Sequence, residues 1–262
     1  MPAFTLRVKI AALAQFNYDQ VQLAPGPLEQ QCRENQQLPF NLSEDSLPRP
    51  FRVREGQPAP GEELGGWYST DAFAPGATYG PWMSALARLY VAAGDPATRA
   101  KVDRLVRGYA ATIDPAGKFY VENRFPLYTY DKLVCGLIAH TFAKNPIALA
   151  TLSRATDAAA RHLPQRAVAR QETPVLARED FTPHCWDESY TLPGNLFLAW
   201  QRSGDSRYSK LARRLLFDRE FFDPLARGEN VLPGKHAYSH VNAELRCPGV
   251  LVARQRTISA RG

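Results

Sequence analysis

The sequence lacks any apolar run that is long enough to cross a membrane. Its longest runs, such as residues 133–138 and 250–253, are far shorter than the roughly 20 residues that a spanning helix needs. The apolar stretch 10–14, which follows Arg7 and Lys9, is also shorter than the apolar core of a typical signal peptide. We therefore expect no membrane partner and no export signal, and the sequence leaves the compartment open.

Cysteine is scarce, and its spacing is uninformative. The four cysteines are Cys32, Cys135, Cys185 and Cys247, and none lies in a CxxC pair or at another spacing typical of zinc sites. Four cysteines allow three full disulfide pairings, and free, buried thiols are our expectation for them. The sequence thus predicts no metal ligand.

Several catalytic and binding motifs are missing as well. The sequence contains no Walker loop and no GxGxxG, HExxH or GxSxG motif, which argues against nucleotide binding, zincin chemistry and α/β-hydrolase chemistry. The net charge is +6, but arginines are scattered from Arg7 to Arg261 without a basic run interleaved with aromatics, so we expect no nucleic-acid partner. With 45% hydrophobic and 22% charged residues, the chain is predicted to be globular with a substantial core.

What the sequence does contain is a helical pattern. Proline and glycine interrupt the first third too often for long helices, and only residues 28–37 are predicted to form a short one. From Trp82 onward, apolar residues recur at the spacing of two amphipathic helices. These residues are Trp82, Leu86 and Leu89 in the first helix and Val102, Leu105, Val106 and Tyr109 in the second.

The turn between these two helices has the composition expected at helix ends. Gly94 suits the position just after a helix, Asp95 suits an N-cap, and proline follows in the first turn of the next helix. Similar turns recur at 145–146 and 203–205, and Gly204 and Asp205 stand 110 residues after Gly94 and Asp95. The chain is therefore predicted to contain at least three helical hairpins.

Repeated helical hairpins form either an open solenoid or a closed ring. The stretches 114–129, 164–188 and 222–241 are long and uneven, and a toroid can carry such loops on one rim around a central pocket. A ring of six hairpins would need about 300 residues at about 50 residues each. We therefore predict an all-α fold, an incomplete (α/α)6 toroid built of helical hairpins with long irregular loops.

The same pattern suggests a division of the chain. We expect an N-terminal extension (1–15), a partial toroid (16–243) and a divergent tail (244–262). Helices of an incomplete ring would leave apolar faces uncovered, and we expect self-association through these faces.

One segment before the third hairpin concentrates side chains suited to sugar binding. Residues 182–190 read TPHCWDESY, in which carboxylates can bind hydroxyl groups and tryptophan can stack on a sugar ring. His184, Trp186, Asp187 and Glu188 are therefore candidate substrate-binding residues. Alternatively, the two acids stabilise a helix N-terminus and Trp186 belongs to the core. Adjacent carboxylates rarely flank a glycosidic bond by themselves, so a second acid for hydrolysis is not identified.

Two further features suggest contacts with a ligand. His236 and His240 are four residues apart, but Gly234 favours a loop over a helical metal site, and we predict that His236 donates to a substrate hydroxyl or makes a structural hydrogen bond. Trp67 and Tyr128 lie in predicted loops before the first and second hairpins. Exposed aromatics there would bind a sugar, whereas buried ones would fix the loops, and burial is the simpler expectation for each.

Several short motifs occur in a characteristic order. They are GGW (65–67), APG (74–76) leading into SALA (84–87), GD (94–95), YTYDKL (128–133), SGDSRY (203–208), DPLARG (223–228) and GxHA (234–237). In order and approximate spacing, over about residues 16–243, they resemble the N-terminal half of the β-L-arabinofuranosidase-like glycosidases, glycoside hydrolase family 127 and its relatives.

The resemblance implies an (α/α)6 catalytic barrel followed by β-sandwich domains, and a saccharide substrate from which terminal β-L-arabinofuranosyl units are cleaved with retention. Members use a zinc-bound cysteine thiolate as nucleophile and a glutamate as acid/base, both later in the chain than the motifs matched here. None of the four cysteines matches the thiolate motif. We therefore assign no catalytic residue and no metal ligand, and expect no cofactor in this chain, although zinc is expected in complete members. Family members are often exported or cytoplasmic.

The chain also departs from the family pattern. Many members read Tyr-Thr-x-His-Lys where this chain has Asp131 in place of histidine, and Gly76-Ala77 and Gly80-Pro81 replace two Gly-His pairs. His236 keeps its motif position, and Asp131 joins the candidate pocket acids. After Ala243 the sequence leaves the pattern abruptly, as a truncation or a reading-frame change would produce. The candidate substrate-binding residues are Trp67, Tyr128, Asp131, His184, Trp186, Asp187, Glu188 and His236.

We therefore expect a glycoside hydrolase-like protein that resembles a non-reducing-end β-L-arabinofuranosidase but lacks the nucleophile and the acid/base. One alternative is a non-catalytic helical-repeat module that binds a glycan or a protein. Another is an α/α-barrel enzyme that acts on a different sugar through Asp187, Glu188 and His236.

Overall fold

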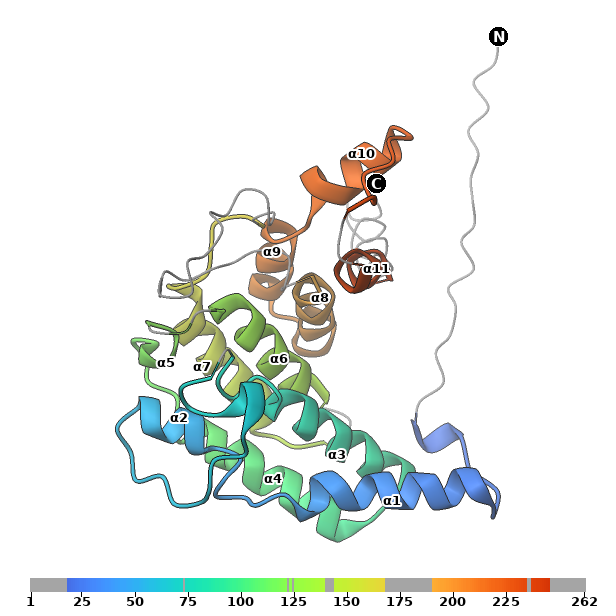
Figure 1. Ribbon diagram of the computed structural model, residues 1–262, viewed down its shortest axis with the longest axis vertical. Coiled ribbons are helices and arrows are strands. Elements are labelled where there is room, and N and C mark those ends of the chain that lie inside the picture. The colour runs from blue at the N-terminus through green and yellow to red at the C-terminus, as the bar shows by residue number, and fades with distance from the viewer. Residues whose placement is uncertain are drawn as a thin grey trace.

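The computed structural model describes residues 18–72, 74–121, 123, 125–139, 144–167, 190–234 and 237–245. Across these ranges the regular structure consists of helices, and no strand occurs (Figure 1). The predicted all-α fold is thus confirmed. None of the helices in these ranges is long and apolar enough to cross a lipid bilayer.

Three helical hairpins form the body of the protein. The elements before them are η1 (Tyr18–Gln20), α1 (Pro27–Asn41), α2 (Arg49–Arg54) and η2 (Gly66–Tyr68). The hairpins are α3 (Tyr79–Ala93) with α4 (Pro96–Ala110), α6 (Pro126–Ala139) with α7 (Ala148–Ala160), and α8 (Leu192–Ser203) with α9 (Ser206–Arg214). The remaining elements are α5 (Lys118–Val121), the π-helix η5 (Asp218–Phe222), α10 (Asp223–Ala226) and α11 (Ala237–Leu245).

The hairpin turns have the structure that their residues predict. Gly94 adopts the left-handed conformation at φ 72°, and Gly204 does so at φ 74°, each directly after its helix. The Asp95 carboxylate accepts from the backbone amides of residues 97 and 98, and Asp205 accepts from the amide of Arg207. The repeat that relates the first and third hairpins is therefore confirmed in detail.

The hairpins stand in an arc with α3, α6 and α8 on one layer and α4, α7 and α9 on the other (Figure 1). Helix α3 packs most extensively on α6, and α6 packs in turn on α8. The buried core runs through all three hairpins without interruption, from Leu86 through Leu133 to Leu196. This arrangement is consistent with an all-α toroid.

Two glycines allow α3 and α6 to approach closely. A Cβ atom at Gly80 would overlap the carbonyl oxygen of Lys132, and one at Gly136 would lie 2.5 Å from the carbonyl oxygen of Gly80. Neither position could carry a side chain without moving the backbone of the other helix. The crossing therefore fixes the part of α6 that contains Lys132.

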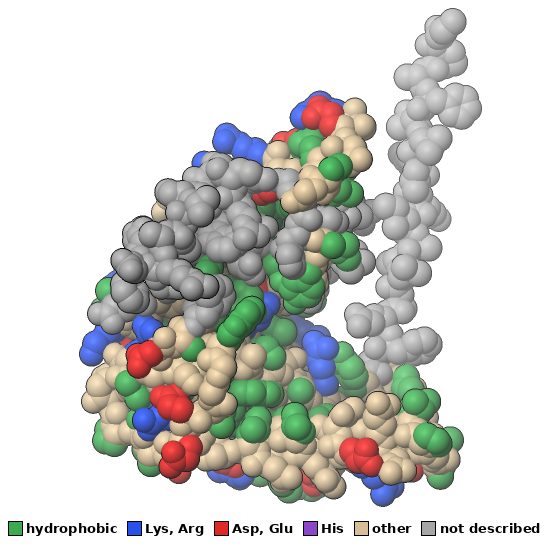
Figure 2. Space-filling model, viewed as in Figure 1, with side chains coloured by type: hydrophobic (Ala, Val, Ile, Leu, Met, Phe, Trp, Pro, Cys, Tyr) green, Lys and Arg blue, Asp and Glu red, His purple; other side chains and the backbone are tan. Residues whose placement is uncertain are grey.

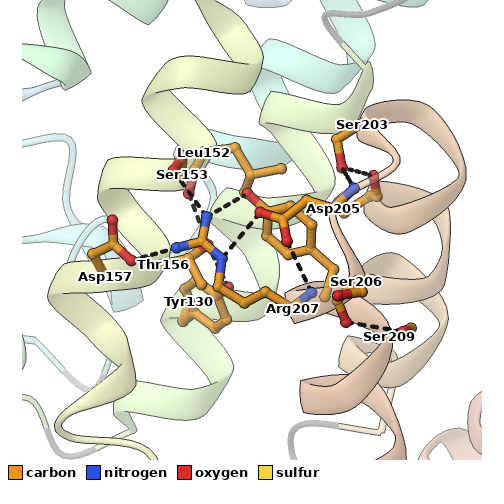
Figure 3. A network of polar contacts seen from close by, with 12 residues as sticks. Tyr130, Leu152, Ser153, Thr156, Asp157, Ser203, Asp205, Ser206, Arg207 and Ser209 are labelled. Atoms are coloured by element: carbon orange, nitrogen blue, oxygen red, sulfur yellow. Dashed lines mark hydrogen bonds and ion pairs between the residues drawn. The ribbon is translucent and has the colours of Figure 1, made fainter.

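Arg207 joins the third hairpin to the second (Figure 3). From α9, its guanidinium donates to Asp157 of α7 and, over 2.8 Å, to the hydroxyl of Ser153, and it pairs with Asp205 at 3.3 Å. Beneath it, the hydroxyl groups of Tyr130 and Thr156 lie 2.8 Å apart and connect α6 to α7. Polar contacts thus join α9 to α7 and α6 to α7.

The structure differs from the predicted helix boundaries in four places. Helix α1 continues past residue 37 through Pro39 to Asn41, and α2 forms inside the stretch expected to be irregular. Residues 126–132 form the start of α6 instead of a loop. Packing against α3 and α8 favours the helix, and the proline in its first turn gives up no hydrogen bond that the helix needs. Helix α11 begins at Ala237, inside the stretch 222–241 that was expected to be irregular, and continues to Leu245.

Candidate functional site

The ends of the hairpins define one rim of the arc. In each hairpin a short turn joins the two helices, so they run antiparallel, and α3, α6 and α8 point the same way. The long connections 111–125, 161–191 and 215–236 each follow α4, α7 or α9. Loops of such length commonly carry function. The first turns of α6 and the residues just before α8 lie at this rim, and they contain most of the residues that form the candidate site.

Asp131 is the buried centre of this site. It lies in α6 with no exposed surface, and its carboxylate receives three donors. Asn195 of α8 donates from its side-chain amide to Oδ1 over 2.7 Å, and the hydroxyl of Thr191, just before α8, donates to Oδ2. Since a buried charge is stable only when it is paired and hydrogen-bonded, these donors explain how Asp131 is accommodated in the core.

The third donor to Asp131 is the ammonium group of Lys132. Its Nζ lies 3.2 Å from Oδ2, and only 15% of the Lys132 side chain is exposed. Burial is the largest single effect and lowers the pKa of Lys132, but the carboxylate of Asp131 and the phenols of Tyr128 and Tyr238 together raise it more, so the net pKa lies above its ordinary 10.5. Lys132 is therefore a held cation near the surface of the site at neutral pH.

Tyrosine rings surround this cation. The Nζ atom of Lys132 lies 4.7 Å from the ring centroid of Tyr128 and 5.9 Å from that of Tyr190, distances typical of cation–π contacts. Tyr190 is buried, and its ring meets that of Tyr238 of α11 edge to face at 5.1 Å. Tyr128 is half-buried and Tyr238 is exposed. We call these residues, Tyr128, Asp131, Lys132, Tyr190 and Tyr238, the Lys132 cluster.

The Lys132 cluster combines groups that bind sugars in proteins. Exposed edges of Tyr128 and Tyr238 offer apolar surface with a phenol at the tip, and the ammonium group of Lys132 has donors beyond the one directed at Asp131. Asp131 itself has no exposed surface, so its role in this geometry is to position Lys132. The arrangement can orient hydroxyl groups.

Of the residues predicted from sequence, the structure brings Tyr128 and Asp131 together. Trp67 lies in η2 ahead of α3 with 66% of its surface exposed, so the expectation that it is buried is wrong. His184, Trp186, Asp187, Glu188 and His236 lie outside the residues that the structure describes.

Sequence reasoning missed Lys132, Tyr190 and Tyr238, and it also missed Asn195, which supports the cluster from α8. Lys132 follows Asp131 directly in the YTYDKL motif, and Tyr190 ends the segment 182–190, so both are close in sequence to candidate substrate-binding residues. Asn195 carries no local signal, because it looks like one more polar residue in an apolar helix. Only the packing of α8 on α6 reveals its contact with Asp131.

The described residues do not fit a zinc–thiolate centre. Cys32 lies in α1 and Cys135 lies in α6, and both are half-buried instead of buried as expected. Within the described ranges, no three His, Cys, Asp or Glu side chains gather closely enough to hold a metal ion. We therefore derive no catalytic step through a metal.

A comparison with known families decides the relationship. Residues 20–257 match the family described as beta-L-arabinofuranosidase, GH127 catalytic domain. The chain belongs to this family. The match covers most of the chain, including the YTYDKL motif that supplies three of the five residues of the Lys132 cluster, and it continues past Ala243. No curated protein matches the chain.

Membership in the GH127 family makes this a glycoside hydrolase-like protein. Its helical arc is that of the family's catalytic domain. Within this arc, the Lys132 cluster lies at the start of α6 and next to the start of α8.

Proposed function

We propose that the Lys132 cluster of this GH127 family member binds a terminal saccharide unit of the β-L-arabinofuranosyl type. The observation that carries the proposal is the position of Lys132, which a buried carboxylate holds between tyrosine rings at the rim of the arc. Lys132 donates to sugar hydroxyls, and Tyr128 and Tyr238 cover the apolar parts of the ring.

Residues adjoining the cluster in sequence are the natural source of further contacts. The segment 184–188 directly precedes Tyr190, and His236 precedes Tyr238 by two residues. We include His184, Trp186, Asp187, Glu188 and His236 in the proposed binding site for this reason, together with Trp67 as an exposed aromatic side chain. Asp131 acts through Lys132 as a positioning residue.

We further propose that this chain binds without cleaving. None of its cysteines matches the family's nucleophile motif, and no acid/base is assigned. Two carboxyl groups, or a thiolate and a carboxyl group, on opposite sides of the bond are what retaining hydrolysis requires. The ammonium group of Lys132 and the phenols around it can bind a sugar, but they do not provide the nucleophile and the acid/base.

The test combines turnover and binding on the whole chain. We expect no release of p-nitrophenol from p-nitrophenyl β-L-arabinofuranoside. We also expect saturable binding of methyl β-L-arabinofuranoside, detected by saturation-transfer NMR. Chelator-sensitive hydrolysis would overturn the claim that the chain does not cleave, and an absence of saturable binding would overturn the site itself. Binding of other glycans on an array, with none of the arabinofuranoside, would favour a non-catalytic module for a different sugar.

A further inference from the structure

A pocket in another part of the structure shares no lining residue with the Lys132 cluster, although Tyr190 of that cluster and Phe217 of the pocket belong to the same buried apolar group. It has a volume of about 240 Å³ and lies between the segment after α7, the end of α9 and the π-helix η5. Its charged lining consists of Arg166, Arg213, Arg214 and Arg219 together with Asp218 and Glu220. Four cations against two anions leave this small space with a net charge of +2. We call it the arginine pocket.

One guanidinium in this pocket is only partly used. Arg214 donates from Nη1 to the side-chain oxygen of Gln165 over 3.2 Å. Its Nε and Nη2 atoms are both buried and have no hydrogen-bond partner. Unmet buried donors are unfavourable, and those of a charged group most of all. An acceptor placed against this edge of Arg214 would remove the penalty.

Another arginine in the same chain shows which acceptor fits. In α4, the Nε and Nη2 atoms of Arg104 donate to the two carboxylate oxygens of Glu44, each over 2.7 Å. This is the bidentate geometry in which a planar guanidinium binds an oxyanion. The Nε and Nη2 atoms of Arg214 form the same pair of donors, but no carboxylate accepts a hydrogen bond from them.

A purely structural explanation accounts for part of the pocket. Arg213 and Arg214 end α9, where cations interact favourably with the helix dipole, and the guanidinium of Arg213 also lies 5.9 Å from the Phe197 ring. This does not explain the buried, unpartnered edge of Arg214. It also does not explain why Arg166 and Arg219, from two other segments, line the same space.

We propose that the arginine pocket binds an oxyanion, the carboxylate of an acidic monosaccharide unit. The Nε and Nη2 atoms of Arg214 receive the carboxylate, and Arg219 supplies further positive charge. Asp218 and Glu220 accept hydrogen bonds from sugar hydroxyls. A small inorganic anion has fewer hydroxyl groups to donate to these two carboxylates. The volume is slightly below the 300–1,000 Å³ of sites for drug-sized ligands, which suits a single sugar unit. The saccharide part of this inference rests on the proposed function, and the oxyanion part does not.

The experiment is a calorimetric titration of the full chain at low salt with D-galacturonate, inorganic phosphate and neutral D-galactose. We expect galacturonate to bind saturably and galactose to bind at least tenfold more weakly. Arg214→Gln should weaken galacturonate binding at least tenfold. Arg107→Gln, which removes one exposed charge from α4, should leave it unchanged.

A second variant covers the case in which Arg214→Gln fails to fold. Arg219 is exposed, so Arg219→Gln should fold and weaken binding severalfold. Tighter binding of phosphate than of galacturonate, lost in the same variants, would overturn the sugar assignment. Binding of neither anion, or binding that ignores both substitutions, would overturn the site. Binding of methyl β-L-arabinofuranoside at the Lys132 cluster is measured independently, so failure here leaves the proposed function standing.

Discussion

The side-chain amide of Asn195 donates a 2.7 Å hydrogen bond to the carboxylate of Asp131, which stands 64 residues earlier in the chain. This bond crosses from α8 to α6 inside the core. It holds the carboxylate that in turn holds Lys132. The candidate site therefore depends on the packing of two hairpins and not on one loop.

Asn195→Ala should destabilise the protein and weaken saccharide binding. Removing a buried donor to a carboxylate costs about 1–3 kcal/mol. Urea denaturation measures the loss of unfolding free energy, and titration with methyl β-L-arabinofuranoside measures the loss of affinity. Gln201→Ala, at an exposed position of the same helix, is the matched control and should change neither. Equal behaviour of the two variants would show that the α6–α8 contact does not support the site.

The Lys132–Asp131 pair should make stability fall at high pH. Because the pKa of Lys132 is raised in the folded state, the folded protein holds this proton more tightly than the unfolded chain does. The stabilisation is fully present below the unfolded value of 10.5 and is lost as pH rises through the folded pKa. Buried tyrosines such as Tyr130, whose pKa burial also raises, act in the same direction.

A comparison with Lys132→Met separates the lysine from the tyrosines. The difference in unfolding free energy between wild type and variant should be constant from neutral pH to about pH 10 and should shrink above pH 10.5. Urea titrations at a series of pH values measure it. A difference that grows with pH would contradict the assigned sign.

Gly80→Ala should disrupt the crossing of α3 and α6. The added methyl group would overlap the carbonyl oxygen of Lys132, and overpacking of this kind costs about 1–3 kcal/mol or more. Gly108→Ala in α4 is the control, since its Cβ would meet only the Tyr79 hydroxyl, at 3.8 Å. The control should be neutral or gain up to about 1 kcal/mol from helix propensity. Thermal unfolding of both variants decides, and similar melting temperatures would contradict the close crossing.

Uncovered apolar side chains should cause self-association. Leu38 in α1 is 70% exposed and Val241 in α11 is 44% exposed. Hydrophobic side chains also gather over the region of α3, α6 and α8 on the face shown in Figure 2. Light scattering should give a mass that rises with protein concentration, and the double substitution Leu38→Lys with Val241→Lys should reduce this rise. Val53→Lys is the control and should leave the rise in mass unchanged. A wild-type protein that stays monomeric at all concentrations would contradict the prediction.

The hairpins were predictable because their turns are specified locally. Gly94 and Asp95, and again Gly204 and Asp205, combine a left-handed residue with an N-cap, and both pairs adopt that structure. The start of α6 was not predictable in this way. Its first turns carry tyrosines and Asp131 in a stretch that resembles a loop in sequence, and burial against α3 and α8 makes it helical.

The candidate site also contains residues that the sequence predicted and residues that it did not. Tyr128 and Asp131 were identified because they stand in a short motif. Lys132 and Asn195 were not, because their roles come from a buried carboxylate shared between two hairpins. The edge of Arg214 is a similar case, since only the three-dimensional contacts show which of its donors lack an acceptor.

The most direct test of the account is a calorimetric titration of methyl β-L-arabinofuranoside into wild type, Lys132→Met and Lys210→Met. Lys210 is an exposed lysine of α9, so its replacement controls for the loss of one charge. If the Lys132 cluster is the saccharide site, Lys132→Met binds at least tenfold more weakly, while Lys210→Met binds like wild type. Equal affinities for all three proteins would contradict the account.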